Sequence, residues 1–258
     1  MRQWIWTCVV GLIYLFLVAP ILIIIPASFS STESITLFSG ALSLRWYHHF
    51  FETPELVASL FLSLRLAAFT TVVACVLGTM AATAIARYRF PGREWLRAFL
   101  MAPMIIPGIV LGIALLMFFS RTLLAGTFAA LLLAHIIIVM PYVVRTVTAT
   151  FAGLDQMLPQ AAMSLGATPL VAFRTVTLPL LKSGIIAGGI FAFITSFDEF
   201  VVSVFLTGPQ LTPLSVQIFT YLEFTSDPTI AAISVILIAL TTVVVLATER
   251  IAGFGQFA

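Results

Sequence analysis

Charged residues are scarce in this sequence. Of its 258 residues, only 9% are Asp, Glu, Lys or Arg, whereas 61% are hydrophobic. A soluble domain carries about 25% charged residues, so this chain has too little charge to cover a surface in water. A mean hydropathy of +1.17 indicates a membrane protein instead. The net charge of +2 does not indicate nucleic-acid binding, because the basic residues stand at the ends of apolar runs rather than in a patch.

Cysteine and catalytic motifs are scarce or absent as well. Cys8 and Cys75 lie within apolar runs and are expected to behave as small hydrophobic residues, so they imply no disulfide framework and no metal site. His48 and His49 are adjacent but have no third ligand at a helical offset, so no metal site is expected. The phosphate-binding motif Gly-x4-Gly-Lys-Ser/Thr and the metalloprotease motif His-Glu-x-x-His are missing. We therefore expect no catalytic residue, no cofactor bound by this chain, and a mechanism based on conformational change.

Long apolar runs dominate what is present. A transmembrane helix needs about 20 apolar residues, and this criterion predicts an all-α membrane protein with about six spans in a single domain, residues 1–258. Pro103 and Pro107 are expected to kink or break the third span, and Asp227 with Pro228 is expected to begin the sixth. The expected spans are residues 4–26, 56–86, 98–120, 128–150, 183–206 and 228–250.

Small residues and a lone histidine predict contacts between spans. Ala74, Gly78 and Ala82 recur at every fourth position of the second span, a spacing that lets another helix approach closely. His135 lies within the fourth span, where we expect it to form a hydrogen bond to another helix rather than to bind a ligand.

Basic residues predict the orientation in the membrane. Arg45 and Arg121 lie on one side of the expected spans, and a larger group lies on the other. Since basic loops stay in the cytoplasm, we expect both termini and the loop 151–182 to be cytoplasmic. The larger group comprises Arg2, Arg87, Arg89, Arg93, Arg97, Arg145, Arg174, Lys182 and Arg250.

The loop 151–182 carries its own signals for helix starts and stops. Pro159 is suited to a first helical position, and Gly166 to the left-handed residue that ends a helix. Thr168 and Pro169 are expected to begin a second short helix, and Pro179 to stop it.

This pair of short helices has an apolar patch of Ala161, Ala162 and Leu165. Small residues on a short helix suit docking into a groove of another protein. The alternative is an amphipathic connector that lies against its own spans.

Two carboxylates interrupt the fifth expected span. Asp198 and Glu199 share one helical face with Thr195 and Ser203. A charge inside the bilayer costs at least a few kcal/mol and usually faces a cavity or a partner, so we expect this polar stripe to line a path for a cation. In two alternatives, a carboxylate pairs with Arg65, or one carboxylate caps the end of a broken helix.

The pair of short helices in the loop 151–182, called the hairpin below, resembles a known motif. Gln160-Ala161-Ala162, Gly166 and Val176-x-Leu178-Pro179 have the spacing of the "EAA" coupling loop of ABC-importer permeases, E-A-A-x3-G-x9-I-x-L-P, with Gln160 in place of the usual Glu. Further segments are similar to permeases of the spermidine/putrescine type, so the resemblance covers nearly the whole chain. These segments are residues 196–209, Leu44-Arg45-Trp46-Tyr47, Ser63-Leu64 and Ala86-Arg87-Tyr88-Arg89-Phe90.

The resemblance implies the fold of a type I ABC importer permease in the inner membrane of a bacterium. It implies a cytoplasmic ATPase that binds ATP-Mg, a second permease subunit that is identical or related, and an external substrate-binding protein. The residues that would couple to the ATPase are Gln160, Ala161, Ala162, Leu165, Gly166, Ala167, Leu178 and Pro179.

The resemblance and the acidic stripe together favour a polyamine as substrate. The alternatives within the class are an amino-acid-like compound, an aminophosphonate and ferric iron. An ion-coupled secondary transporter, in which Asp198 and Glu199 bind the coupling ion, is a further alternative. That alternative does not account for the structured loop, and the sequence shows no inverted repeat of the kind many such transporters carry.

Overall fold

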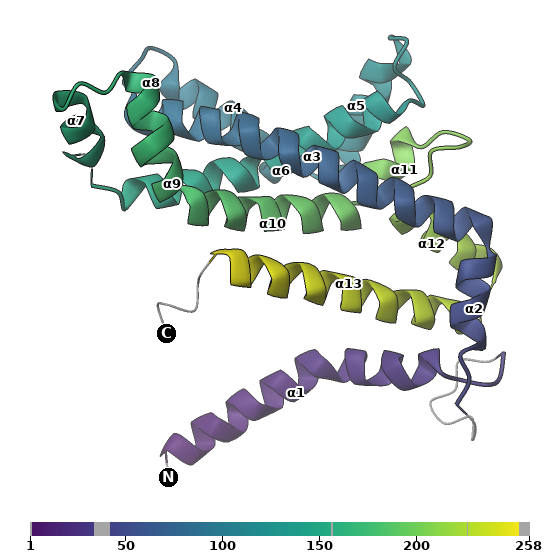
Figure 1. Ribbon diagram of the computed structural model, residues 1–258. Helices are drawn as coiled ribbons and strands as arrows, with labels where there is room; N and C mark the ends of the chain where they lie inside the picture. The colour runs from purple at the N-terminus through teal and green to yellow at the C-terminus, as the bar shows by residue number, and fades with distance from the viewer. Residues whose placement is uncertain (1, 34–41, 156, 226, 253–258) are drawn as a thin grey trace. The chain divides into compact units, whose positions relative to one another are not determined.

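The computed structural model describes residues 2–33, 42–155, 157–225 and 227–252. Helices make up almost all of its regular structure (Figure 1). Within these ranges the backbone forms no named strand, and its β-bridges are two isolated pairs, Ser30 with Leu42 and Gly208 with Leu211. The prediction of an all-α protein is confirmed.

The chain divides into two compact units. One comprises residues 1–58 and 217–243, and the other comprises residues 59–216 and 244–258. The first unit contains α1 (Arg2–Ser28), α2 (Arg45–Glu52), and most of α12 (Leu214–Phe224) and α13 (Thr229–Ala252). The hairpin and the acidic pair, Asp198 and Glu199, both belong to the second unit, together with most of α3 (Pro54–Arg87).

Four to six segments of the described chain are long and apolar enough to cross a membrane. Four are single helices: α1, α3, α6 (Phe128–Ala152) and α13. Two more are bent pairs: α4 (Arg93–Ile105) with α5 (Gly108–Ser120), at 108°, and Pro169–Leu180 with α10 (Lys182–Asp198), at 66°. The expected count of about six therefore requires each bent pair to form one span.

Pro107 breaks the third expected span, whereas Pro103 does not. Helix α4 continues through Pro103, and Ile106 then turns to an extended conformation with ψ 130°. A residue that precedes proline prefers this conformation, because the proline ring clashes with a helical neighbour. Pro107 then serves as the N-cap of α5, so residues 98–120 do not form one continuous helix.

Small residues bring α3 close to α6. Ala74 and Ala82 are fully buried, and a Cβ on Gly78 would lie 2.8 Å from Cγ1 of Val143 in α6. Without a side chain at Gly78 the two backbones can approach closely, which is how helices associate in lipid. The predicted close approach along Ala74, Gly78 and Ala82 is confirmed.

A second close contact joins α10 to α6. A Cβ on Gly188 would lie 2.9 Å from the Cα atom of Val143, and a Cβ on Gly184 would collide with the side chain of Thr150. The two glycines are four residues apart and face the same helix, so α10 is held firmly along α6. The spacing of Gly184 and Gly188 was not used to predict this contact.

Candidate functional site: a helical hairpin and a broken helix

The first helix of the hairpin begins earlier than predicted. Helix α7 spans Met157–Ser164, and the Met157 N–H donates to Oδ1 of Asp155 at 2.8 Å. Pro159 is therefore the third helical residue, and the prediction that it stands first is wrong. It is tolerated there because the first four N–H groups of a helix have no partner within the helix.

Gly166 ends α7 as expected. Its φ angle is +95°, the left-handed conformation that glycine adopts without strain. The Gly166 N–H donates to the Met163 carbonyl at 3.0 Å, and the Ala167 N–H donates to the Ala162 carbonyl at 3.1 Å. These two bonds form a Schellman motif, which satisfies the last carbonyls of the helix and fixes the direction of the chain that leaves it.

The second helix of the hairpin begins as expected and ends differently. Thr168 is the N-cap of α8 (Pro169–Ala172), and its Oγ1 accepts from the Val171 N–H at 3.4 Å. The prediction that Pro179 stops this helix is wrong. A π-helical turn, η1 (Phe173–Thr177), precedes α9 (Leu178–Leu180). The helix therefore runs through Pro179 and ends at Leu180, and the chain bends by 66° at Leu181 before α10 begins.

The π-turn explains why Pro179 is tolerated. The N–H of Leu178, the residue before it, donates to the Phe173 carbonyl five residues back. This wider spacing accommodates a proline that has no N–H to donate and whose ring crowds the preceding turn. Leu181, which is fully buried, marks the bend into α10.

Helix α7 and the turn that follows it carry an exposed apolar surface. Leu165 is 89% exposed and Met157 is 71% exposed, and Gln160, Ala161 and Gly166 are exposed as well. Ala162 and Ala167 are partly buried, and Leu178 and Pro179 are exposed. The hairpin therefore turns several of the predicted coupling residues outward, where the described part of this chain does not cover them.

The acidic pair lies at a break in the helix. Helix α10 ends at Asp198, Glu199 has an extended ψ of 109°, and a new turn, α11 (Ser203–Leu206), follows. The prediction that Thr195, Asp198, Glu199 and Ser203 share one helical face is therefore wrong, and the fifth expected span, 183–206, is not one helix.

Glu199 is used to stabilise this break. Its Oε1 atom accepts from the Val202 N–H at 2.9 Å, and its backbone carbonyl accepts from the Ser215 hydroxyl at 2.9 Å. A carboxylate that accepts from the N–H three residues later caps the turn that follows it. Here that turn leads into α11, whose own N-cap residue is Val202. The geometry therefore matches one of the two alternatives, in which a carboxylate caps a broken helix.

Ser203 is buried against a histidine. Its hydroxyl is fully buried and lies 3.0 Å from Nε2 of His135, whose Nδ1 lies 2.8 Å from the hydroxyl of Ser196. The imidazole thus joins α6 to both sides of the break. The prediction that His135 forms hydrogen bonds to another helix is confirmed.

Asp198 remains as the carboxylate that faces outward. Its side chain is exposed and that of Thr195 is partly buried. Among the described residues no ion pair joins Arg65 to Asp198 or Glu199. The Arg65 guanidinium lies over the ring of Phe128 instead, with its carbon 5.0 Å from the ring centroid.

Three serines around the break, Ser63, Ser196 and Ser215, were not predicted as part of this site, whereas Ser203 was. Ser63 of α3 accepts from the Leu214 N–H at 2.8 Å and so holds the start of α12. Ser196, Ser203 and Ser215 bind the break itself, as described above. One sequence pattern could have indicated these contacts. It is a lone histidine in one span together with two serines that flank an acidic pair in another.

Comparisons with known proteins identify the family. Residues 74–253 match the family described as "Binding-protein-dependent transport system inner membrane component". The chain is also 34% identical over 240 residues to the spermidine/putrescine transport system permease protein PotC of Escherichia coli K12, covering 93% of this chain and 90% of PotC. The chain belongs to this family. The matched region includes both the hairpin and the break.

Other relatives of this permease agree. The putrescine transport system permease protein PotI of Escherichia coli K12 is 32% identical over 247 residues, covering 93% of this chain and 88% of PotI. A bacterial ABC transporter involved in the import of alginate has the same fold, with a TM-score of 0.78 at 16% identity, covering 96% of this chain and 95% of that one. The expected ABC importer permease fold and inner-membrane location are confirmed.

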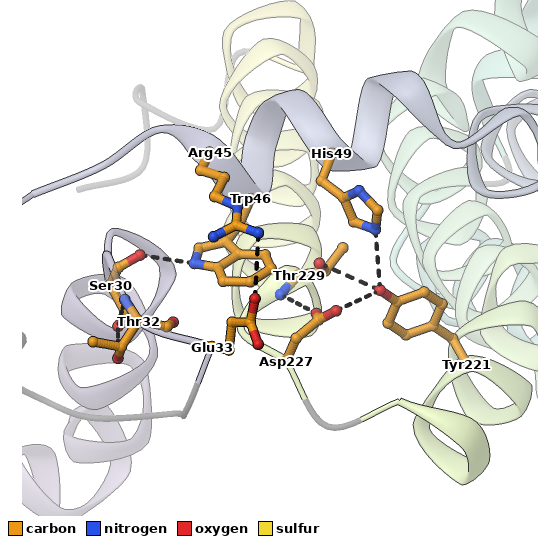
Figure 2. Close-up of polar contacts among 9 residues, drawn as sticks. All are labelled: Ser30, Thr32, Glu33, Arg45, Trp46, His49, Tyr221, Asp227 and Thr229. Atoms are coloured by element: carbon orange, nitrogen blue, oxygen red, sulfur yellow. Dashed lines mark hydrogen bonds and ion pairs between the residues drawn. The ribbon is translucent and has the colours of Figure 1, made fainter.

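The first unit of the permease has its own polar contacts, which connect α2 to the start of α13 (Figure 2). The Tyr221 hydroxyl donates to Oδ2 of Asp227 at 2.8 Å and lies 3.4 Å from Nε2 of His49. Burial raises the pKa of Tyr221, and the Asp227 carboxylate raises it further. Oδ1 of Asp227 accepts from the Thr229 N–H at 2.8 Å, so Asp227 caps α13 as expected, although the helix begins at Thr229 rather than at Pro228.

Proposed function

We propose that this permease forms half of the translocation path of an ATP-driven importer and is coupled to a cytoplasmic ATPase through α7. The observation that carries the proposal is the exposed apolar surface of α7, which ends in the fixed turn at Gly166. A short helix with small and apolar residues suits a groove on another protein. Two ATPase subunits would supply that groove and bind ATP and Mg²⁺, and this chain would bind no cofactor.

The hairpin offers a route by which motion of the ATPase reaches the break. Helices α7 and α8 contact each other, and the helical chain then runs through η1 and α9 into α10. Helix α10 is packed on α6 through Gly184 and Gly188 and ends at Asp198. A displacement of α7 would therefore be transmitted along packed helices to the acidic residues.

The proposed substrate is a polyamine, such as spermidine or putrescine. PotC and PotI are named as permeases for these compounds, and the likeness to each covers most of both chains. Asp198 supports the proposal, because an exposed carboxylate at a break within a membrane segment can attract a cation. Glu199 is occupied as a cap, so Asp198 is the residue proposed to meet the substrate, with Thr195 beside it on α10.

Family membership supports the remaining components of the proposal. A second permease subunit, identical or related, would complete the path, and an external binding protein would deliver the substrate. Both termini and the hairpin would face the cytoplasm, as the basic residues indicate. Family membership favours this importer over an ion-coupled secondary transporter.

Uptake of labelled spermidine and putrescine tests the substrate. We expect cells that lack this gene to lose uptake and cells with the restored gene to regain it, with unlabelled polyamines as competitors. Unchanged uptake in cells that have no other polyamine importer would refute the polyamine proposal. Competition would then be tested with amino-acid-like compounds, aminophosphonates and ferric iron.

A further inference from the structure

His135 occupies an unusual position relative to the acidic break. It lies on α6 and is 1% exposed, and its two ring nitrogens contact serines on different sides of the break. Nδ1 lies 2.8 Å from the hydroxyl of Ser196 in α10, and Nε2 lies 3.0 Å from the hydroxyl of Ser203 in α11. Asp198 and Glu199 lie between the two serines, so the histidine bridges the segment that carries them.

Both hydrogen bonds can form whichever of the two ring nitrogens carries the proton. In the neutral imidazole one nitrogen donates and the other accepts, and a serine hydroxyl can do either. All three side chains are buried, and a buried polar group without a partner is strongly disfavoured. The arrangement therefore fixes the distance between the end of α10 and the start of α11 more firmly than apolar packing alone.

The other contacts of the break leave Asp198 as its free carboxylate. Glu199 is held through both its side chain and its carbonyl, by Val202 and Ser215. Among the described residues, no hydrogen bond or ion pair engages the Asp198 carboxylate. Its position thus depends on the backbone that His135 and Glu199 hold on either side of it.

We propose that His135 is a positioning residue, which holds the break so that Asp198 presents its carboxylate at one fixed place along the path. This inference rests on the proposed function, in which Asp198 meets a cationic substrate. His135 itself does not contact the substrate, because it is buried between α6, α10 and α11. Its effect on transport passes through Asp198.

The first test measures the position of residue 198 without any substrate. In membranes that contain the assembled transporter, with C8A and C75A to remove the native thiols, D198C is labelled with a charged methanethiosulfonate reagent. We expect H135L to change the labelling rate by roughly 3- to 10-fold, as the loss of one or two buried hydrogen bonds predicts, and H135N to restore part of it. The matched probe L123C, at a position 101% exposed in the same unit, is expected to react at an unchanged rate.

Two outcomes of this test would overturn the proposal. One is an unchanged D198C rate in H135L, and the other is an equal change at D198C and L123C, which would indicate general loosening. If H135L does not accumulate in the membrane, S203A replaces it. That variant removes only the Nε2 contact, and an unchanged D198C rate in S203A would then count against the proposal in the same way.

The second test uses transport and a double-mutant cycle. S203A is expected to lower cation uptake severalfold when Asp198 is present and to have little further effect when D198N is already in place, because coupled residues are not additive. Losses that simply multiply would show that His135 and Ser203 act elsewhere. If the wild-type transporter moves no polyamine, the proposed function fails, while the labelling test still decides the role of His135.

Discussion

Gly166 is the residue on which the end of α7 depends. Its φ of +95° is costly for a residue with a Cβ, by roughly 1–2 kcal/mol. A Cβ at this position would meet no other atom within 4 Å, so a substitution acts on the turn and on what docks there rather than on the packing of this chain. We predict that Gly166→Asp abolishes ATP-driven uptake while the protein still inserts into the membrane.

Gly166→Asn is the matched control, because asparagine has nearly the size of aspartate without its charge, and both tolerate the left-handed conformation better than most side chains. It should retain much more uptake than Gly166→Asp at equal amounts of membrane protein, measured by immunoblot of the membrane fraction. Normal uptake by Gly166→Asp would contradict a coupling role for this turn. Co-purification of the ATPase with each variant would show whether docking is the step that is lost.

Asp198 and Glu199 are adjacent carboxylates with different environments. Asp198 is exposed and is proposed to meet the cation, whereas Glu199 accepts from the Val202 N–H. We predict that Asp198→Asn lowers the rate of polyamine uptake strongly, with unchanged protein in the membrane. Glu199→Gln should have a smaller effect, because the amide oxygen can still accept the capping bond.

Glu199→Leu separates the cap from the charge. It removes the capping acceptor at a cost of about 1 kcal/mol and should lower both uptake and the thermal stability of the detergent-solubilised transporter. Equal transport losses in Asp198→Asn and Glu199→Gln would show that the charge of both carboxylates matters. The different roles inferred from the structure would then be wrong.

At the scale of helices, substitutions at the contact between α10 and α6 test whether motion of the ATPase reaches the break through α10. A Cβ at residue 188 would lie 2.9 Å from the backbone of Val143, so the helices must separate to admit it. Overpacking of this kind costs about 1–3 kcal/mol. We predict that Gly188→Ala lowers the temperature at which the solubilised transporter aggregates and reduces the uptake obtained per ATP hydrolysed.

Gly189→Ala is the control on the same helix. Its Cβ would lie 3.2 Å from the sulfur atom of Cys75, the end of a small side chain that can move. It should therefore behave nearly as the wild type in both measurements. If the two variants behave alike, close contact of α10 with α6 does not transmit the motion.

The helices and turns also show which parts of the fold can be predicted from residues close in the sequence. The apolar runs predicted the long helices, and Gly166 and Thr168 predicted the turn between α7 and α8, because each of these depends on residues close in the sequence. Pro179 was misjudged, since a π-turn five residues long accommodates it. The break after Asp198 was predicted only as an alternative to one continuous span, because it is stabilised by Ser215 and by His135 of another helix, and such contacts are distant in the sequence.

At the scale of the whole molecule, the sidedness of the chain decides whether the hairpin can reach an ATPase. The excess of basic residues near residues 87–97 and 145–182 predicts that this side is cytoplasmic. Leu165 in the hairpin and Leu123 between α5 and α6 are both highly exposed, and the proposal assigns them to opposite sides of the membrane. They are therefore suitable positions for single cysteines in a background that carries C8A and C75A.

We predict that L165C reacts with a membrane-impermeant thiol reagent in inverted vesicles but not in intact spheroplasts, and that L123C shows the reverse. We expect this because positively charged loops are retained in the cytoplasm during insertion, which would place the hairpin on the cytoplasmic side. Addition of the purified ATPase to stripped inverted vesicles should slow the reaction of L165C, since docking would cover α7. Labelling of L165C from outside the spheroplasts would place the hairpin away from ATP, and the coupling proposal could not survive that result.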